Sequence, residues 1–317
     1  MPQFPHLRRV AAAASITGLA LSLTACTSGS GGGSSAEGTV TIGFVNGGDT
    51  EFHTCLQKSV EATANGSKVK LYTANSHQNP GTELSNIEDM ISRNVDALIV
   101  QTVNVDALKG DIAKARSAKI PIFLTSVVTD DPTEILGAVV VDLTKVGQLD
   151  ADWVAEDAAG KAAEVGIIAG APGAASDLLT SGFSKQLPSN TKVVASQPGM
   201  FNAAKAQDVA ENMIQAHPNL AYAFVANEEM AFGARKAFAA AGKNVKIVTV
   251  NGTEQGLAAV KDGRFSATVA NSAMTTGQLA VDNSLSLLRK GGTEKIAKTP
   301  IALITKENLA EAPRYCP

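Results

Sequence analysis

The stretch "LSNIEDMISRNVDALIV", residues 84–100, contains the two patterns that decide the fold. Its first part places Leu84, Ile87 and Ile91 at helical spacing, which predicts a helix with one apolar face. Its last part, "ALIV" (97–100), is apolar at every position, as in a parallel strand covered on both faces. A helix that leads directly into such a strand is typical of α/β proteins, so this stretch predicts a parallel sheet between helices.

The same alternation of short β-branched runs and Ala-rich helical runs continues from Thr39 onward. It predicts an α/β fold built of βαβ units. Strands are expected near 40–45, 68–73, 97–101, 121–125, 136–141, 164–169, 191–197, 222–226, 246–250, 266–270 and 301–305. Helices between them include 82–93, 105–118, 203–216, 228–241 and 274–290.

The first 38 residues carry targeting signals. Arg8 and Arg9 precede an apolar run, residues 10–23, that is too short to span a bilayer of roughly 30 Å. The "LTAC" motif that ends in Cys26 resembles a bacterial lipoprotein signal, in which residues 1–25 are removed and Cys26 is lipidated. A buried helix or a plain signal peptide is the alternative interpretation.

Residues 26–38 are mostly Gly and Ser, which predicts a flexible tether with a reach of roughly 20 Å. We therefore expect an extracytoplasmic protein that is lipid-anchored to the cell membrane. Residues 39–317 are long enough for one large or two medium domains. In an exported protein, Cys55 and Cys316 predict a disulfide, with two unpaired cysteines as the alternative.

Composition and motifs argue against several functions. A net charge of −3, with 4% aromatic residues and no basic run, argues against nucleic-acid binding. The chain has no G-x-S-x-G, P-loop or H-E-x-x-H motif, so we expect neither an enzyme nor a cofactor. His53 and Cys55 are two residues apart, but no third ligand is evident, so no metal site is expected.

Polar residues recur at the ends of predicted strands. Asn46, Asn227, Asn251 and Asn271 end or follow runs such as "FVN" and "TVAN", and Asp142 follows "VVV". A single asparagine at this position is usually a turn or a helix cap. Ligands of open parallel sheets bind beyond the carboxyl ends of the strands, so the five residues together predict a binding crevice.

Five blocks of the sequence are distinctive: "NPGTELSNIEDMISRNVDALIVQ", "IPIFLTS", "QPGMFN", "FVANEEMAFGA" and "VNGTEQG". In this order they resemble the ribose-binding family of periplasmic-type sugar-binding proteins, and the resemblance covers nearly all of residues 39–307. It implies a type I periplasmic binding protein with two doubly wound three-layer α/β/α lobes joined by a three-segment hinge. The implied N-terminal lobe is 39–142 plus 272–301, and the implied C-terminal lobe is 143–271 plus 302–317.

The resemblance also implies a ligand pocket. In the loop after the first strand it points to Asn46, Thr50, Phe52 and His53, and Asp49 lies in the same loop. The adjacent glycines are expected to let this loop bend tightly. Phe52 would stack on a sugar ring, and His53 would replace an aromatic residue with a hydrogen-bonding ring. A capped surface histidine at a helix start is the alternative for His53.

Residues of this chain also occupy other pocket and hinge positions of the family. Phe201 matches the second stacking aromatic, and the implied amides are Asn227, Asn251 and Asn271. Asp142 matches an aspartate at the first hinge crossing.

Departures from the family pattern bear on the ligand. The family's Asp–Arg pair is replaced by Ser126 and Val127, and an arginine is replaced by Asp177. D-ribose is therefore not expected to be the best ligand, and Asp177 leaves a cationic ligand such as an amino sugar open.

The resulting functional prediction is a monomeric solute-binding lipoprotein. It captures a small neutral sugar or polyol between two closing lobes and delivers it to the permease of an ABC importer. No Lys or Arg occurs among the implied site residues, so a buried anionic ligand would lack a countercharge. The alternative is a receptor that reports its ligand to a membrane signalling partner.

Overall fold

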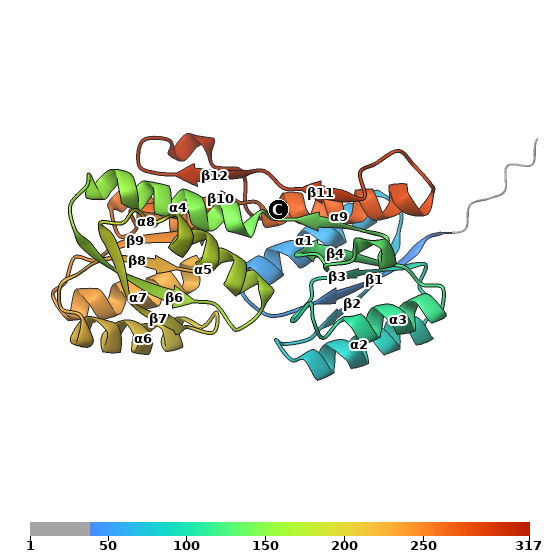
Figure 1. Cartoon of the computed structure of the whole chain (residues 1–317). Helices are drawn as coiled ribbons and strands as arrows, with labels where there is room; N and C mark the ends of the chain where they lie inside the picture. The colour runs from blue at the N-terminus through green and yellow to red at the C-terminus, as the bar shows by residue number, and fades with distance from the viewer. Residues whose placement is uncertain (1–38) are drawn as a thin grey trace, which may run out of the picture. The chain divides into compact units, whose positions relative to one another are not determined.

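The computed structural model describes residues 39–317, which contain two six-stranded sheets (Figure 1). The predicted leader, Cys26 and the tether lie outside the described residues. The first sheet has the strand order β11-β5-β4-β3-β1-β2, and all of its neighbouring strands are parallel. Its strands are β1 (Thr41–Asn46), β2 (Lys70–Asn75), β3 (Ala97–Val100), β4 (Ile122–Ser126), β5 (Gly137–Val140) and β11 (Ile296–Lys298).

Helices cover both faces of the first sheet because its strands present apolar side chains on both sides. Phe44 and Ile99 belong to the core under α1 and α9, whereas Val45 belongs to the core under α2 and α3. Neighbouring strand residues point to opposite faces, so an uninterrupted apolar run supplies both cores. The helices are α1 (Glu51–Gly66), α2 (Pro80–Ser92), α3 (Lys109–Ser117) and α9 (Ala273–Leu288).

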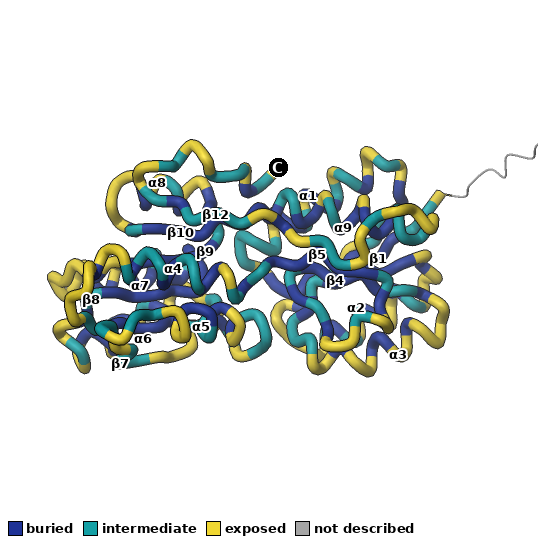
Figure 2. The backbone as a smooth tube through the Cα atoms, turned by 45° about the horizontal axis from the view of Figure 1, so that its top comes forward, coloured by how far each residue is buried: buried dark blue, intermediate teal, exposed yellow. Residues whose placement is uncertain are grey.

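The second sheet has the order β12-β10-β9-β8-β6-β7, with only β12 antiparallel to its neighbour. Its strands are β6 (Ala163–Ala169), β7 (Thr191–Pro198), β8 (Leu220–Val225), β9 (Lys246–Asn251), β10 (Ala267–Asn271) and β12 (Ile301–Ile304). Its helices are α4 (Leu143–Ala158), α5 (Ala174–Gln186), α6 (Ala203–Ala216), α7 (Glu228–Ala240) and α8 (Glu254–Asp262). Figure 2 shows the same arrangement by burial, with most strands buried and helices exposed on their outer sides.

The chain passes between the sheets three times, as the type I fold requires. The passages join β5 to α4, β10 to α9, and β11 to β12. The predicted fold class, two α/β/α lobes with a three-segment hinge, is therefore confirmed. Within residues 39–317, no helix is long and apolar enough to cross a membrane.

Two elements differ from the prediction. The helix expected over 105–118 begins at Lys109, because the Asn104 side-chain oxygen accepts hydrogen bonds from Asp106 N and Ala107 N. This turn competes with helix formation. The three-residue strand β11 was not predicted, since its sequence "IAK" is too short to show a pattern and pairs only at the edge, with β5.

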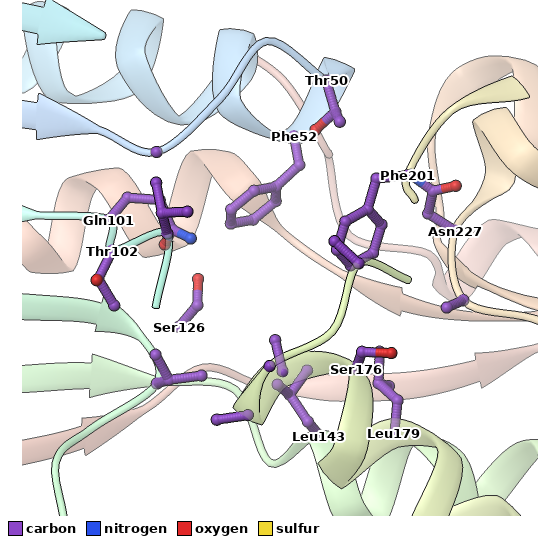
Figure 3. A pocket seen from close by; sticks show the side chains of 18 of the residues that line it. Thr50, Phe52, Gln101, Thr102, Ser126, Leu143, Ser176, Leu179, Phe201 and Asn227 are labelled. Atoms are coloured by element: carbon purple, nitrogen blue, oxygen red, sulfur yellow. The ribbon is translucent and has the colours of Figure 1, made fainter. Parts of the chain in front are cut away.

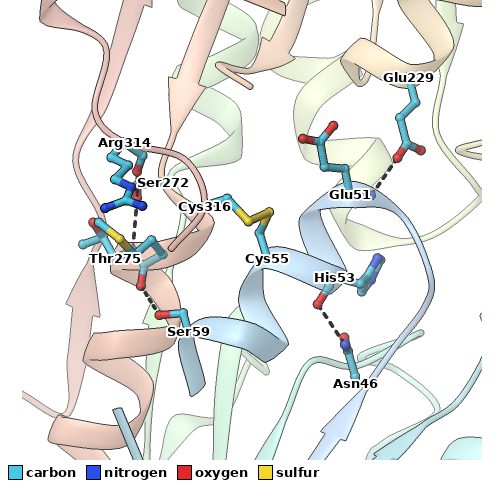
Figure 4. Close-up of a disulfide and its surroundings, with 11 residues drawn as sticks. Asn46, Glu51, His53, Cys55, Ser59, Glu229, Ser272, Thr275, Arg314 and Cys316 are labelled. Atoms are coloured by element: carbon cyan, nitrogen blue, oxygen red, sulfur yellow. Dashed lines mark hydrogen bonds between the residues drawn. A yellow bond between two sulfur atoms is a disulfide. The ribbon is translucent and has the colours of Figure 1, made fainter. Parts of the chain in front are cut away.

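The C-terminal tail returns from the second sheet to the first. After β12 and the short 3-10 helix η2 (Leu309–Glu311), Cys316 forms a disulfide with Cys55 on α1 (Figure 4). The Ser272 hydroxyl donates to the carbonyl of Arg314 at 2.6 Å, and Met274 N donates to the carbonyl of Tyr315 at 2.9 Å. The tail therefore adds a covalent connection beside the three hinge passages.

Candidate functional site

A cavity of about 340 Å³ lies between loops that follow strands of both sheets (Figure 3). The strand order reverses next to β1 in the first sheet and next to β6 in the second, and loops after β1, β3, β6 and β8 line the cavity. Such a reversal opens a crevice beyond the strand ends, where ligands bind in open α/β sheets. The lining residues are Gly47, Thr50, Phe52, His53, Gln78, Pro80, 101–105, Ser126, Val127, Val141, Leu143, 171–176, Leu179, Met200, Phe201, Ala226, Asn227, Val250, Asn251 and Asn271.

Two buried polar atoms of this lining have no hydrogen-bond partner within the described chain. They are Oγ of Ser126, at the end of β4, and Oδ1 of Asn271, at the end of β10. Leaving a buried polar atom unpaired costs about 1–3 kcal/mol. Polar groups of a ligand in the cavity would satisfy both atoms.

Three amide side chains of the lining are partly engaged and keep donors for a ligand. Oδ1 of Asn227 accepts from Met230 N at 2.9 Å and so caps α7, while Oδ1 of Asn251 accepts from Glu228 N at 3.4 Å. Oε1 of Gln101 accepts from the Thr125 hydroxyl at 2.9 Å. In each case the oxygen is held by the protein, so the NH₂ group is the part available to a hydroxyl group of a ligand.

Two phenylalanines enter the cavity, one from each lobe. Phe52, in the first turn of α1, and Phe201, after β7, project toward the cavity in Figure 3. The Phe201 ring lies so close to Gly170 that a Cβ there would be 2.1 Å from its ring. Gly170 therefore makes room for the aromatic side chain.

His53 lines the cavity and shares a hydrogen bond of 2.7 Å with the Thr50 hydroxyl through Nδ1. Burial lowers the pKa of His53 to about 4, although the nearby Asp49 carboxylate acts in the opposite direction. The imidazole is therefore neutral at pH 7. A neutral ring can both donate and accept a hydrogen bond, as hydroxyl groups do.

The backbone is strained around the cavity. Five lining residues other than glycine have positive φ: Gln78, Ser126, Met200, Phe201 and Asn251. Such conformations cost about 1–3 kcal/mol each and persist where the surrounding structure imposes them. Their concentration here supports a functional role for the cavity.

Two buried glutamates hold the loops that carry the lining. Glu83 of α2 accepts from Val103 N at 2.7 Å and from the Thr102 hydroxyl at 2.8 Å, and burial raises its pKa to about 6. Glu228 of α7 accepts from Gly252 N and Thr253 N, both at 2.9 Å. Each carboxylate thus ties a helix start to the loop after the following strand.

Four of the residues predicted for the site do not line the cavity. Asn46 is buried, and its NH₂ group donates to the carbonyl of His53 at 3.0 Å, so it supports the loop from below (Figure 4). Asp49 pairs instead with His77 at 2.7 Å on the surface. Asn46 and Asp49 instead line a separate surface pocket.

Asp142 and Asp177 are the other two. The Asp142 carboxylate caps α4 by accepting from Lys145 N at 3.1 Å, and it lies 3.4 Å from the Lys298 ammonium group. Asp142 thus serves the hinge. Asp177 is exposed on the first turn of α5, and its neighbour Ser176 lines the cavity instead.

The two loop glycines can be compared with their expected role of letting the loop bend. Neither Gly47 nor Gly48 has a positive φ, so no unusual turn requires them. A Cβ at Gly47 would lie 2.7 Å from the carbonyl oxygen of Gln101, so glycine is needed for close approach of two loops.

Other lining residues were not predicted, chiefly those of 101–105 and 171–176 and the apolar Val141, Leu143 and Leu179. Gln101 directly follows β3, so the rule that located the strand-end asparagines applies to it as well. The apolar residues carry no such signal. None of the cavity-lining residues in the described chain is Asp, Glu, Lys or Arg.

Comparison with known proteins identifies the family to which this architecture belongs. Residues 42–293 match the family described as "Periplasmic binding protein domain". The ribose import binding protein RbsB of Bacillus subtilis is 30% identical over 81% of this chain and 84% of its own length. The xylitol-binding protein of Mycolicibacterium smegmatis is 27% identical over 95% of this chain and 86% of its own.

Among solved structures, the periplasmic binding protein component of the arabinose ABC transporter from Shewanella sp. ANA-3 superposes with a TM-score of 0.81. It is 27% identical, and the match covers 86% of this chain and 93% of that one. Sequence, fold and cavity therefore agree that the chain belongs to the periplasmic binding protein family, among the relatives of the ribose-binding proteins.

Proposed function

We propose that this chain captures a small neutral sugar or polyol and delivers it to the permease of an ABC importer. The observation that supports this most directly is the composition of the cavity. Its polar groups are hydroxyls, amides and a neutral imidazole, two of its buried oxygens are unpartnered, and it has no charged side chain. Such groups match the hydroxyls of a sugar, whereas an ionic ligand would be buried without a countercharge.

The proposed binding residues are the predicted residues that line the cavity, together with Gln101. The predicted members are Thr50, Phe52, His53, Ser126, Phe201, Asn227, Asn251 and Asn271. The similar proteins are named for ribose, xylitol and arabinose, which are consistent with a ligand of this size and polarity. The proposed lobes are 39–142 plus 272–301 and 143–271 plus 302–317, closing on the ligand as a monomer without a cofactor.

A thermal-shift screen of sugars, polyols, organic acids and peptides tests the ligand class. A ligand at 100 times its dissociation constant should add roughly 2.7 kcal/mol to stability. The variant Ser126→Ala should lose part of this stabilisation, whereas Ser117→Ala, on the exposed end of α3, should retain it. A response confined to organic acids or peptides would rule out the proposed ligand class.

Attachment and delivery are tested in cells. Lipidation at Cys26 predicts that Cys26→Ala moves the protein from the membrane fraction to the soluble fraction, and an unchanged distribution refutes the anchor. Delivery predicts that deletion of the protein abolishes uptake of the labelled ligand. Retained uptake with loss of a transcriptional response would instead identify a receptor for a signalling partner.

A further inference from the structure

One side of the cavity is hydrocarbon. Val127, Val141, Leu143 and Leu179, here called the apolar wall, all line the cavity and all belong to the single hydrophobic core of the second sheet. Each is less than 9% exposed. In Figure 3, Leu143 and Leu179 lie together at one side of the cavity, across from Thr50 and Phe52.

The backbone of the apolar wall offers little to a polar ligand. The N–H groups of Val127, Val141 and Leu143 donate to the carbonyls of Thr125, Ser126 and Val141 at 2.8–3.1 Å. Leu179 lies within α5, where its N–H belongs to the helix. A hydroxyl group placed against these four residues would lose its water and gain no partner.

Polar groups border this wall without entering it. The hydroxyl of Ser176, beside Leu179, is turned away from Leu143 in Figure 3. Asn104 also lines the cavity; its side-chain oxygen accepts from Asp106 N and Ala107 N, so its NH₂ group is a donor at the border of the wall and not part of it. The cavity therefore has polar groups on two opposite sides and, between them, a wall that favours carbon-bound hydrogen.

We propose that the preferred ligand is a sugar that lacks one hydroxyl group, a deoxy sugar whose methyl or methylene group contacts the apolar wall. This inference rests on the proposed function and narrows its ligand class. The cavity volume of about 340 Å³ is near the lower limit for small-molecule sites, which suits a single sugar ring. The hydroxyl groups of the ring face Ser126 and Gln101 on one side of the cavity and Asn227 on the opposite side, and the deoxygenated carbon faces the wall.

Calorimetric titration of the unaltered chain with matched sugar pairs tests the proposal. The pairs are L-fucose with L-galactose, L-rhamnose with L-mannose, D-fucose with D-galactose, and 5-deoxy-D-ribose with D-ribose. In the pair that fits the cavity, the deoxy member should bind at least about tenfold more tightly, because an unpaired buried hydroxyl weakens binding by about this factor or more.

The outcomes separate this inference from the proposed function. If sugars or polyols bind but no deoxy member is preferred over its partner, the inference is wrong and the proposed function stands. If no sugar or polyol binds in any form, both are wrong.

A variant tests whether the wall causes the preference. Val127→Thr is nearly isosteric and adds one hydroxyl to the wall, so the ratio of the two affinities should fall about fivefold or more. Val154→Thr, on α4 in the same core but away from the cavity, is the matched control and should leave the ratio unchanged. An unchanged ratio in a folded Val127→Thr protein overturns the assignment of the wall, and the titration of the unaltered chain does not depend on how either variant folds.

Discussion

At the scale of single residues, the cavity separates residues that contact a ligand from residues that hold them in place. His53 lines the cavity, and Asn46 beneath it donates to the His53 carbonyl. The sequence places both residues in one loop but does not show which side chain faces inward. Asn46 ends β1 and His53 lies in the first turn of α1, so which of the two side chains faces the cavity depends on how the strand and the helix pack, which the local sequence does not reveal.

His53 predicts a specific pH dependence. Its pKa falls from 6.5 to about 4 on folding because burial disfavours the charged ring. The unfolded chain therefore takes up a proton first as the pH falls, and the His53 contribution to stability is present above pH 6.5 and lost as the pH falls toward 4. The loss amounts to at most about 3 kcal/mol.

Denaturant titrations of the unaltered protein and His53→Gln between pH 7 and pH 4 measure this contribution. The unaltered protein should lose more stability over this range than the variant. Glu83, whose pKa is raised to about 6, contributes in the opposite direction, but it is present in both proteins and cancels in the comparison. Equal losses would contradict a buried, neutral His53.

The absence of a side chain at Gly170 leaves space for the Phe201 ring, and this can be tested by substitution. An added methyl group would lie 2.1 Å from the Phe201 ring, so Gly170→Ala should push the ring out of its position. We expect ligand affinity to fall about tenfold or more, since an aromatic contact is worth about 1 kcal/mol and the displaced ring also narrows the cavity. Calorimetric titration measures the change, and Gly292→Ala, where an added Cβ meets no atom, is the control.

At the scale of elements, α4 contains a buried acid with no partner. Asp150 is fully buried, both of its carboxylate oxygens lack hydrogen bonds in the described chain, and burial raises its pKa well above the usual value of 3.8. Glu228 adds to this effect through charge repulsion. The folded state therefore favours the protonated acid.

The raised pKa of Asp150 determines how its contribution to stability changes with pH. A raised pKa gives stability that is present below pH 3.8 and lost as the pH rises. Asp150→Asn, which is never charged, should be more stable than the unaltered protein at pH 7 by about 1–3 kcal/mol, with the difference disappearing in acid. Chemical denaturation at pH 7 and at pH 3.5 measures it; a variant that is less stable at pH 7 would refute the protonated state.

The bounds of the helices show which features of the fold the sequence patterns predict. The helix expected at 203–216 has those bounds, because its apolar period, its Asn202 cap and the following His-Pro pair all agree. Helix α3 begins four residues later than expected, because the local turn at Asn104 competes with the helix and Glu83 holds the preceding loop through a contact distant in sequence.

In the candidate site, too, some residues could be predicted from the local sequence and others could not. Asn227, Asn251 and Asn271 were located by their positions after apolar strands, and all three line the cavity. Within the apolar wall, the resemblance pointed only to the position of Val127; Val141, Leu143 and Leu179 were not predicted, because valine and leucine in a cavity look the same in sequence as in a core.

At the scale of the whole molecule, one polar contact joins helices of the two lobes. The Glu229 carboxylate of α7 accepts a hydrogen bond of 2.6 Å from Glu51 N, in the first turn of α1 (Figure 4). An anion at a helix N-terminus is stabilised by the unpaired N–H groups and the helix dipole. The contact therefore favours the arrangement in which the two lobes are close.

Removal of this contact should favour an open form. Glu229→Gln should raise the radius of gyration of the ligand-free protein and weaken ligand binding about threefold to tenfold, as expected for one charge-assisted hydrogen bond near the surface. Small-angle scattering with and without ligand measures the first effect, and titration measures the second. Glu211→Gln on α6, outside the cavity, is the control, and an identical radius in both variants would contradict a role in closure.

The disulfide predicts a large effect on global stability. The chain-entropy account gives about 5 kcal/mol for a loop of this length, although measured values fall between about 2 and 5 kcal/mol. The double variant Cys55→Ser/Cys316→Ser should therefore unfold at lower denaturant concentration. Mass mapping of a non-reduced digest checks the pairing itself, and two free thiols there would refute it.

The same bond turns most of the folded chain into a closed ring. Residues 55–316 are covalently continuous in both directions, whereas residues 39–54, which include β1, form a branch that leaves the ring at Cys55. A protease that cuts one loop inside the ring therefore releases no fragment, and the two pieces stay joined until the disulfide is reduced. Tension applied through the N-terminal branch is carried first by β1, which lies between β2 and β3 in the interior of the first sheet. Once β1 has been pulled out, the force reaches Cys55 and is divided between α1 and the C-terminal tail, which the disulfide joins.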